Sequence, residues 1–253
     1  MSEDIELPGK GDLRDLPLAS IAVYAIRCAL RVQPVWALWE KPTAEYKEAI
    51  IQLRAAYRIL AYSGYTEADA KAAYEAAYVA YEAANASSDS NAIASANAAN
   101  AAASAASAAY NAARHNASDA ANAANAAALA SRASHAAIAA RKDYLRLAEM
   151  ETEVSDASET GPLGDLWGGA APDWYIKAKA MFNKTIAGWG GESGENIEID
   201  LGEELSVYID PGDAPSELIT DLYIALNALF KAHGGPGLEI AGEKFRILKG
   251  ELI

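Results

Sequence analysis

Cysteine and histidine are scarce in this sequence of 253 residues. The only cysteine is Cys28, so no disulfide can form within the chain, and a reducing compartment is expected. The three histidines are His115, His135 and His233, and none belongs to a recognisable set of closely spaced metal ligands. We expect the first two to be exposed and the third to complement a helix C-terminus. The sequence therefore predicts no metal site and no cofactor.

Long apolar runs are also missing. The opening residues, MSEDIELPGKGDLRD, are acidic and lack the apolar centre of a signal peptide. No run of about 20 strongly apolar residues is found. The charge-free stretch 90–113 comes nearest, but its asparagine amides would each cost several kcal/mol in hydrocarbon if unpaired. These observations predict no membrane span and a cytoplasmic location.

Positive charge is scarce, with 21 Lys and Arg against 35 Asp and Glu and a formal net charge of −14. Nucleic acid is therefore not an expected partner. Residues 188–230 contain no Lys or Arg at all. This segment is expected to form a solvated acidic face, or alternatively a docking surface for a basic protein partner. The residues assigned to that surface are Glu198, Asp200, Glu203, Glu204, Asp210 and Asp213.

Glycine and proline are absent from residues 65–160, where alanine, the strongest helix former, dominates. Thr66 and Asp69 have the spacing of a capping box, which predicts a helix over residues 67–86. Ser and Asp residues at 86–90 predict a break. One further helix over residues 89–149 would be about 90 Å long, too long for a compact domain of this size.

The few residues that interrupt the alanines of this tract recur every three or four positions, on one narrow polar stripe of a continuous helix. Alanine covers the rest of the surface, so neighbours must cover several sides of the helix. A compact monomer would need a hairpin between residues 114 and 119. The alternative, which we favour, is an antiparallel homodimer. The stripe consists of Asn97, Asn100, Ser104, Ser107, Asn111, Arg114, Ser118, Asn122, Asn125, Leu129 and Arg132.

The whole chain is predicted to be mainly α, as an Ala-rich helical bundle or a long-helix coiled assembly. We expect residues 1–16 to be a mobile leader and residues 17–160 to form the Ala-rich helical domain, which begins with helices over 18–33 and 43–62. The PVWALWEKP connector between them should fold back onto the core. We expect a Gly/Pro/Trp-rich linker with one helix over 161–194. Alternating patterns and an amphipathic helix over 214–233 predict a small C-terminal α+β module, β-β-α-β-β, over 195–253.

Two motifs, AIRCALRVQPVW and GPLGDLWGGAAPDWY, flank the Ala-rich tract. Together they resemble a set of uncharacterised Ala-rich bacterial proteins over residues 18–180. The resemblance implies a bacterial, cytoplasmic, helical protein and transfers no catalytic residue. The C-terminal module resembles small α+β modules of bacterial signalling or conflict proteins.

Four arginines form the most notable charged set. Arg27 and Arg31 are four residues apart on the first expected helix, and Arg54 and Arg58 are four apart on the second. They are expected to reach solvent or pair with nearby glutamates. The alternative is that they converge as an anion-binding pocket or as the docking site for the acidic C-terminal module.

No nucleophile, phosphate loop or metal constellation accompanies these features. We therefore expect a non-enzymatic protein-interaction scaffold or adaptor, with an enzyme or small-anion-binding protein as the alternative.

Overall fold

The computed structural model describes residues 6–62, 64–131, 134–150, 152–159 and 161–189, and beyond them the strand segments 197–200, 206–209, 238–240, 243–245, 247–248 and 251–252. The chain divides into two units, Met1–Trp189 and Gly190–Ile253. The first unit is mainly helical, as the sequence predicts. Its helices are α1 (Lys10–Arg14), α2 (Leu18–Val32), η1 (Gln33–Ala37), α3 (Ala44–Leu60), α4 (Glu67–Asn85), α5 (Ser90–Ala113), α6 (Ala117–Ala130), α7 (Ser134–Glu149) and α8 (Asp173–Trp189).

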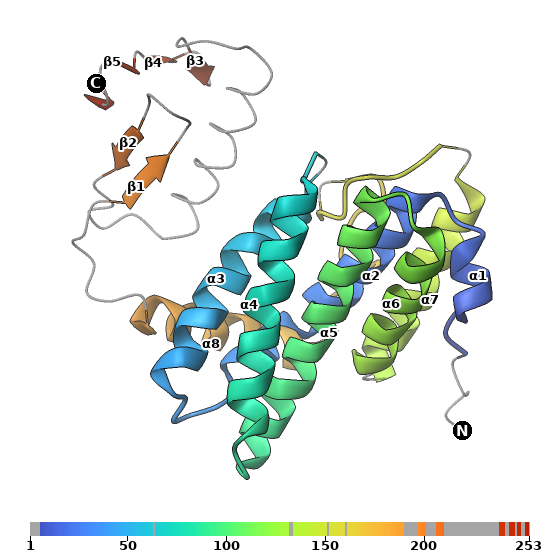
Figure 1. Ribbon diagram of the computed structural model, residues 1–253, viewed down its shortest axis with the longest axis horizontal. Coiled ribbons are helices and arrows are strands. Elements are labelled where there is room, and N and C mark those ends of the chain that lie inside the picture. Colours follow the sequence, from blue (N-terminus) through green and yellow to red (C-terminus); the bar gives the residue numbers. More distant parts are fainter. Residues whose placement is uncertain are drawn as a thin grey trace. The chain divides into compact units, whose positions relative to one another are not determined.

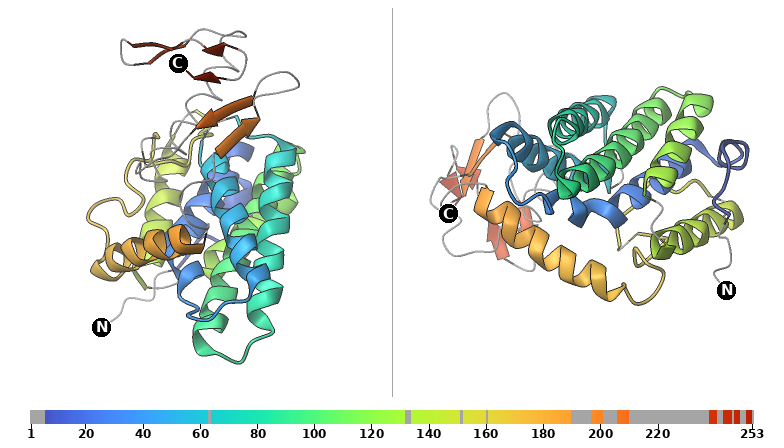
Figure 2. Two further views of the ribbon diagram at one scale, coloured as in Figure 1. Left: turned by 90° about the vertical axis from the view of Figure 1, so that its left-hand side faces the viewer. Right: turned by 90° about the horizontal axis from the view of Figure 1, so that it is seen from below.

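Helices α3, α4, α5 and α6 pack side by side in chain order, and α2 packs against α5, α6 and α7 (Figure 1). Seen from below, α2 lies between this row and the helices α7 and α8 (Figure 2). Almost every residue of α2 is buried, including Arg27 and Arg31. The helix therefore forms the centre of the unit, with neighbours on opposite sides.

The Ala-rich tract after residue 89 is three helices, so the alternative of one continuous helix is wrong and the alternative of a break near residues 114–119 is confirmed. The chain turns back after α5, with His115 in the left-handed region at φ 59°. The amide of Asn116 donates to the carbonyl of Asn111, and the amide of His115 donates to that of Ala112, which together close the helix end. Asn116 then caps α6 by accepting from the Asp119 amide at 3.2 Å. This is the hairpin that the sequence offered as the alternative to a dimer.

Most alanines of α5 are buried within a single chain, because α4, α6, α2 and η1 all pack against that helix. Short side chains allow such close approach on several sides. Tyr57 of α3 and Ser95 of α5 add hydrogen bonds across the bundle, to the carbonyls of Ala102 and Val35. The unpaired alanine face that motivated the dimer is thus covered by the chain itself.

The predicted domain limits need two corrections. Residues 10–14 belong to α1 rather than to a mobile leader, since Leu13 is fully buried and Arg14 donates to Ser118 at 2.8 Å. Residues 161–189 belong to the helical unit rather than to a linker, because α8 packs against η1 and α3. The connector does fold back as expected, with Trp36 and Trp39 buried.

In the second unit, β1 (Ile197–Asp200) pairs antiparallel with β2 (Ser206–Ile209). Two more antiparallel pairs join β3 (Leu238–Ile240) to β4 (Glu243–Phe245) and β5 (Ile247–Leu248) to β6 (Glu251–Leu252). The amphipathic helix predicted over 214–233 lies outside the described residues. The predicted β-β-α-β-β order contains two strand pairs, so the β5–β6 pair is additional to it. The α+β module itself stays a prediction.

Candidate functional site

A buried ion cluster connects α2 to α7. Arg27 donates from Nε to the Asp143 carboxylate at 2.8 Å, and Arg31 donates from Nη2 to the same carboxylate oxygen. Both guanidinium groups are completely buried, and the Asp143 side chain is 3% exposed. Two positive charges therefore share one negative charge in the interior, where removal of the carboxylate would be costly.

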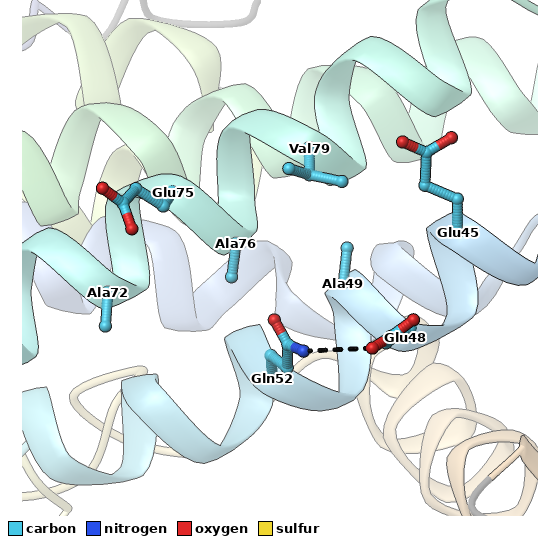
Figure 3. A pocket seen from close by; sticks show the side chains of 8 residues that line it. All are labelled: Glu45, Glu48, Ala49, Gln52, Ala72, Glu75, Ala76 and Val79. Atoms are coloured by element: carbon cyan, nitrogen blue, oxygen red, sulfur yellow. Dashed lines mark hydrogen bonds between the residues drawn. The ribbon is translucent and has the colours of Figure 1, made fainter.

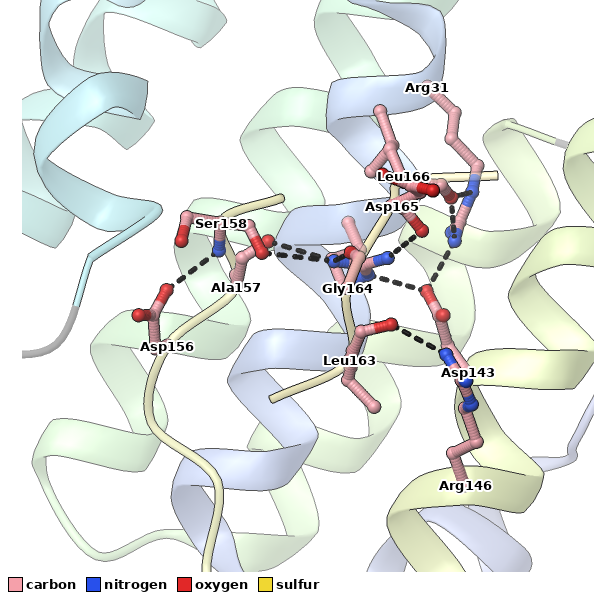
Figure 4. A network of polar contacts seen from close by, with 11 residues as sticks. Arg31, Asp143, Arg146, Asp156, Ala157, Ser158, Leu163, Gly164, Asp165 and Leu166 are labelled. Carbon is pink, nitrogen blue, oxygen red and sulfur yellow. Dashed lines mark hydrogen bonds and ion pairs between the residues drawn. The ribbon is translucent and has the colours of Figure 1, made fainter. Parts of the chain in front are cut away.

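The same two arginines bind residues 157–159 and 161–166, which we together call the strap. Figure 4 shows Arg31 and Asp143 beside Gly164, Asp165 and Leu166 of the strap. Arg27 donates to the carbonyls of Ala157, Ser158, Gly164 and Asp165 at 2.8–3.3 Å. Arg31 donates twice to the carbonyl of Leu166, at 2.7 and 2.9 Å. The backbone carbonyls of a segment outside helices and sheets need hydrogen-bond donors when they are buried away from water. The charged guanidinium groups of Arg27 and Arg31 supply these donors. These contacts give Arg27 and Arg31 a structural role.

The four arginines of the sequence hypothesis have different surroundings. Arg54 lies over the ring of Phe182 at 5.6 Å and donates to Asn183 on α8 at 3.3 Å, whereas Arg27 and Arg31 bind Asp143 and the strap. Arg58 is half-buried. Because Arg27 and Arg31 are 0% exposed, neither offers a guanidinium to an anion from solvent.

A buried thiol lies beside the ion cluster. Burial raises the pKa of Cys28 to about 11, with the charge of Arg31 opposing the shift and that of Asp143 adding to it. Burial likewise raises the pKa of the neighbouring Tyr24. Cys28 is fully buried, and a thiol that stays protonated is a poor nucleophile, so we expect it to react slowly in the folded chain.

This shift predicts a stability loss in alkali. The folded thiol stays protonated, while the unfolded thiol ionises near its ordinary pKa. The unfolded state therefore binds fewer protons, and a rise in pH stabilises it relative to the folded state. Between pH 9 and pH 10 the wild type should lose about 1 kcal/mol more unfolding free energy than Cys28→Ala. Urea titrations at the two pH values measure this difference, and equal losses in both proteins would contradict it.

An acidic groove lies on the surface between the packed helices α3 and α4 (Figure 3). Its volume is about 360 Å³. Glu45 and Glu48 line it from α3 and Glu75 from α4, with Ala49, Ala76 and Val79 between them. Glu75 also pairs with Lys71 at 3.6 Å on the exposed surface, where such pairs contribute little. The groove lining itself contains three carboxylates and no cationic side chain among the described residues.

On the other side of α4 lies a second groove, which we call the tyrosine groove. Two adjoining hollows of about 310 and 340 Å³ share Tyr74 and Ser107. Tyr74 and Tyr78 are 41% and 49% exposed, with their rings stacked at 6.3 Å and 20°. The tyrosine groove is lined by Lys71, Tyr74, Glu75, Tyr78 and Tyr81 of α4, by Asn100, Ala103, Ser104, Ser107, Tyr110 and Asn111 of α5, and by Ala123 of α6.

The polar stripe noted in the sequence supplies one side of the tyrosine groove. Asn100, Ser104, Ser107 and Asn111 line it in sequence order along α5, opposite the tyrosines of α4. Asn111 donates to the Ser107 carbonyl at 2.9 Å within its own helix. The sequence revealed the Asn/Ser stripe through its spacing, and Tyr74, Tyr78 and Tyr81 are also spaced by four and three residues along α4. Their juxtaposition depends on how α4 and α5 pack, which the spacing does not reveal.

The remaining predicted residues are placed only in part. Glu198 and Asp200 lie in β1, whereas Glu203, Glu204, Asp210 and Asp213 lie outside the described residues. His115 occupies the turn after α5, His135 lies on α7, and His233 lies outside the described part. Within the described part of the chain, no three His, Cys, Asp or Glu side chains gather as a metal site.

One helical stretch, Leu18–Ala37, is long and apolar enough to cross a membrane by length and composition. The prediction of no such run therefore overlooked this stretch. It contains the central helix α2, and 72% of it is buried inside the helical unit. The core helix of a folded domain has the same length and composition. Length and composition alone are weak evidence for a span.

No family model, curated protein or solved structure matches this chain. The resemblance to Ala-rich bacterial proteins stays a prediction.

Proposed function

We propose that this protein is a non-enzymatic adaptor that binds an extended peptide segment of a partner protein in the tyrosine groove. The observation that carries the proposal is the row of exposed tyrosines, Tyr74 and Tyr78, facing the amide and hydroxyl side chains of α5. Tyrosine is enriched at interface positions that dominate binding energy, because its rigid ring offers apolar area and a polar tip. Neutral amides and hydroxyls then pair with peptide backbone groups.

Three further features belong to the proposal. The cytoplasmic location rests on the composition and on the single cysteine. The C-terminal residues 195–253 are proposed to fold as a small α+β module, for which the three strand pairs are support. The acidic residues of that segment are a second candidate surface for a basic partner. The small-anion alternative has less support, since Arg27 and Arg31 are buried against Asp143.

A displayed random-peptide library tests the groove. We expect the wild type to enrich peptides, and we expect Tyr74→Ala/Tyr78→Ala to lose at least about tenfold in affinity for them, because two exposed anchor side chains are removed. Fluorescence anisotropy with the enriched peptides measures the loss.

The matched control is Ile138→Ala/Leu145→Ala on α7, which removes two side chains of comparable exposure, 41% and 47%. This double variant should bind as the wild type does. Enrichment that survives the tyrosine variant, or no enrichment at all, would contradict the proposal.

A further inference from the structure

We infer that the tyrosine groove takes a proline-rich segment in the polyproline II conformation, followed by a Lys or Arg. This inference rests on the proposed function and names the chemistry of the partner. Three observations support it. The length of the tyrosine row fits the polyproline II repeat, the polar lining fits the proline carbonyls, and the adjacent acidic groove fits the Lys or Arg.

The repeat of polyproline II fits the tyrosine row. Tyr74 and Tyr81 are seven residues apart on α4, which is about 10.5 Å at the rise of an α-helix. Prolines at positions i and i+3 of a polyproline II segment lie about 9 Å apart. Two such prolines can therefore rest beside the first and last rings, with Tyr78 between them. The small side chains of Ala103 and Ala123 leave the hollow open between the helices.

The polar groups of the groove suit a ligand that accepts hydrogen bonds. Polyproline II has no internal hydrogen bonds, and proline has no amide hydrogen, so its carbonyls need external donors. Donors for such carbonyls are the hydroxyls of Ser104 and Ser107, the amide of Asn100 and the phenol of Tyr74. The Tyr78 phenol is hydrogen-bonded to the Glu82 carboxylate, so Tyr78 offers its ring. Aromatic-lined grooves with interspersed donors recognise this preformed, low-entropy helix.

Charge selects the residue that comes after the prolines. The hollow beside Tyr78 and Tyr81 contains no charged lining residue, which suits the uncharged prolines. Glu75 lines both the tyrosine groove and the acidic groove, where Glu45 and Glu48 add two more carboxylates. Lys71 lines the same hollow as Glu75 and pairs with it at 3.6 Å, so the excess negative charge comes from Glu45 and Glu48 of the acidic groove. A Lys or Arg that follows the prolines and reaches that groove complements this charge.

Labelled peptides of known sequence test the assignment. The probe is a fluorescein-labelled oligoproline of about ten residues that ends in two arginines, and its control replaces the prolines by glycine and serine. We expect the full-length protein to bind the probe, Tyr78→Ala to weaken binding about 5- to 30-fold, and the control peptide to bind at least tenfold more weakly. Leu145→Ala is the matched protein control and should bind as the wild type does.

The charged end is tested separately. Glu75→Gln should weaken the arginine-ended probe about two- to threefold and leave an oligoproline without arginines unchanged. If Glu75→Gln weakens the binding of both peptides, or of neither peptide, the assignment of the basic end is overturned.

Failure of the inference can be told apart from failure of the proposed function. If the oligoproline does not bind but library peptides without proline bind in a Tyr78-dependent way, the inference is overturned and the adaptor proposal stands. If no peptide binds in a Tyr78-dependent way, both are overturned. Tyr78-dependent binding to a glycan array in place of peptides would also overturn both.

Discussion

Asp143→Ala is expected to lower the unfolding free energy by about 3–5 kcal/mol, because it leaves two buried guanidinium groups without their carboxylate. The loss extends to the strap, since Asp143 orients the arginines that bind the carbonyls between Ala157 and Leu166. Urea unfolding followed by circular dichroism measures the change.

Two variants show whether the charge cluster is the cause. Asp165→Ala removes an exposed carboxylate from the strap and keeps the carbonyl that binds Arg27, so its stability should stay within about 0.5 kcal/mol of the wild type. Arg31→Met leaves the Arg27–Asp143 pair intact and should be less destabilising than Asp143→Ala. A loss below about 1 kcal/mol in Asp143→Ala would show that the cluster does not hold the strap.

Local signals in the sequence predict individual helices well. The capping box at Thr66 is formed, with the Asp69 amide donating to Thr66 at 3.2 Å. The Ser/Asp break is where α4 and α5 separate, and Asp89 caps α5. Such signals depend on residues within one turn of each other, so the sequence alone contains them.

The ion cluster could not be predicted in the same way. Arg27 and Arg31 are four residues apart and drew attention as a pair, but Asp143 lies more than a hundred residues away on α7. The sequence of the strap from residue 161 onward predicts a Gly/Pro-rich linker, because the side chains that bind its carbonyls belong to α2 and not to the strap itself. The tyrosine groove likewise combines two rows from different helices. Spacing identifies the members of such sites, and tertiary packing decides which members meet.

The hairpin of α5 and α6 was left open for a similar reason. The turn consists of Arg114, His115 and Asn116 between alanines, and no glycine marks the end of α5. His115 takes the left-handed position that glycine usually occupies. The local evidence is the Asn116 cap three residues before Asp119, which is a weak signal inside an otherwise helical tract.

Buried alanines of this hairpin should not tolerate larger side chains. Ala106 on α5 and Ala124 on α6 are both 0% exposed, and neighbouring helices pack closely against them. We expect Ala106→Leu or Ala124→Leu to lower the unfolding free energy by about 1–3 kcal/mol, because the added methyl groups force packed helices apart. Thermal and urea unfolding measure the loss.

Ala126→Leu is the matched control, because Ala126 is exposed on the same helix as Ala124 and leucine is nearly as good a helix former as alanine. Its stability should stay within a few tenths of a kcal/mol of the wild type. Since one chain already covers its own alanines, light scattering should give the monomer mass of 26.6 kDa for the wild type and for all three variants. A wild-type dimer that Ala106→Leu converts to monomer would instead show that these alanines pack between two chains.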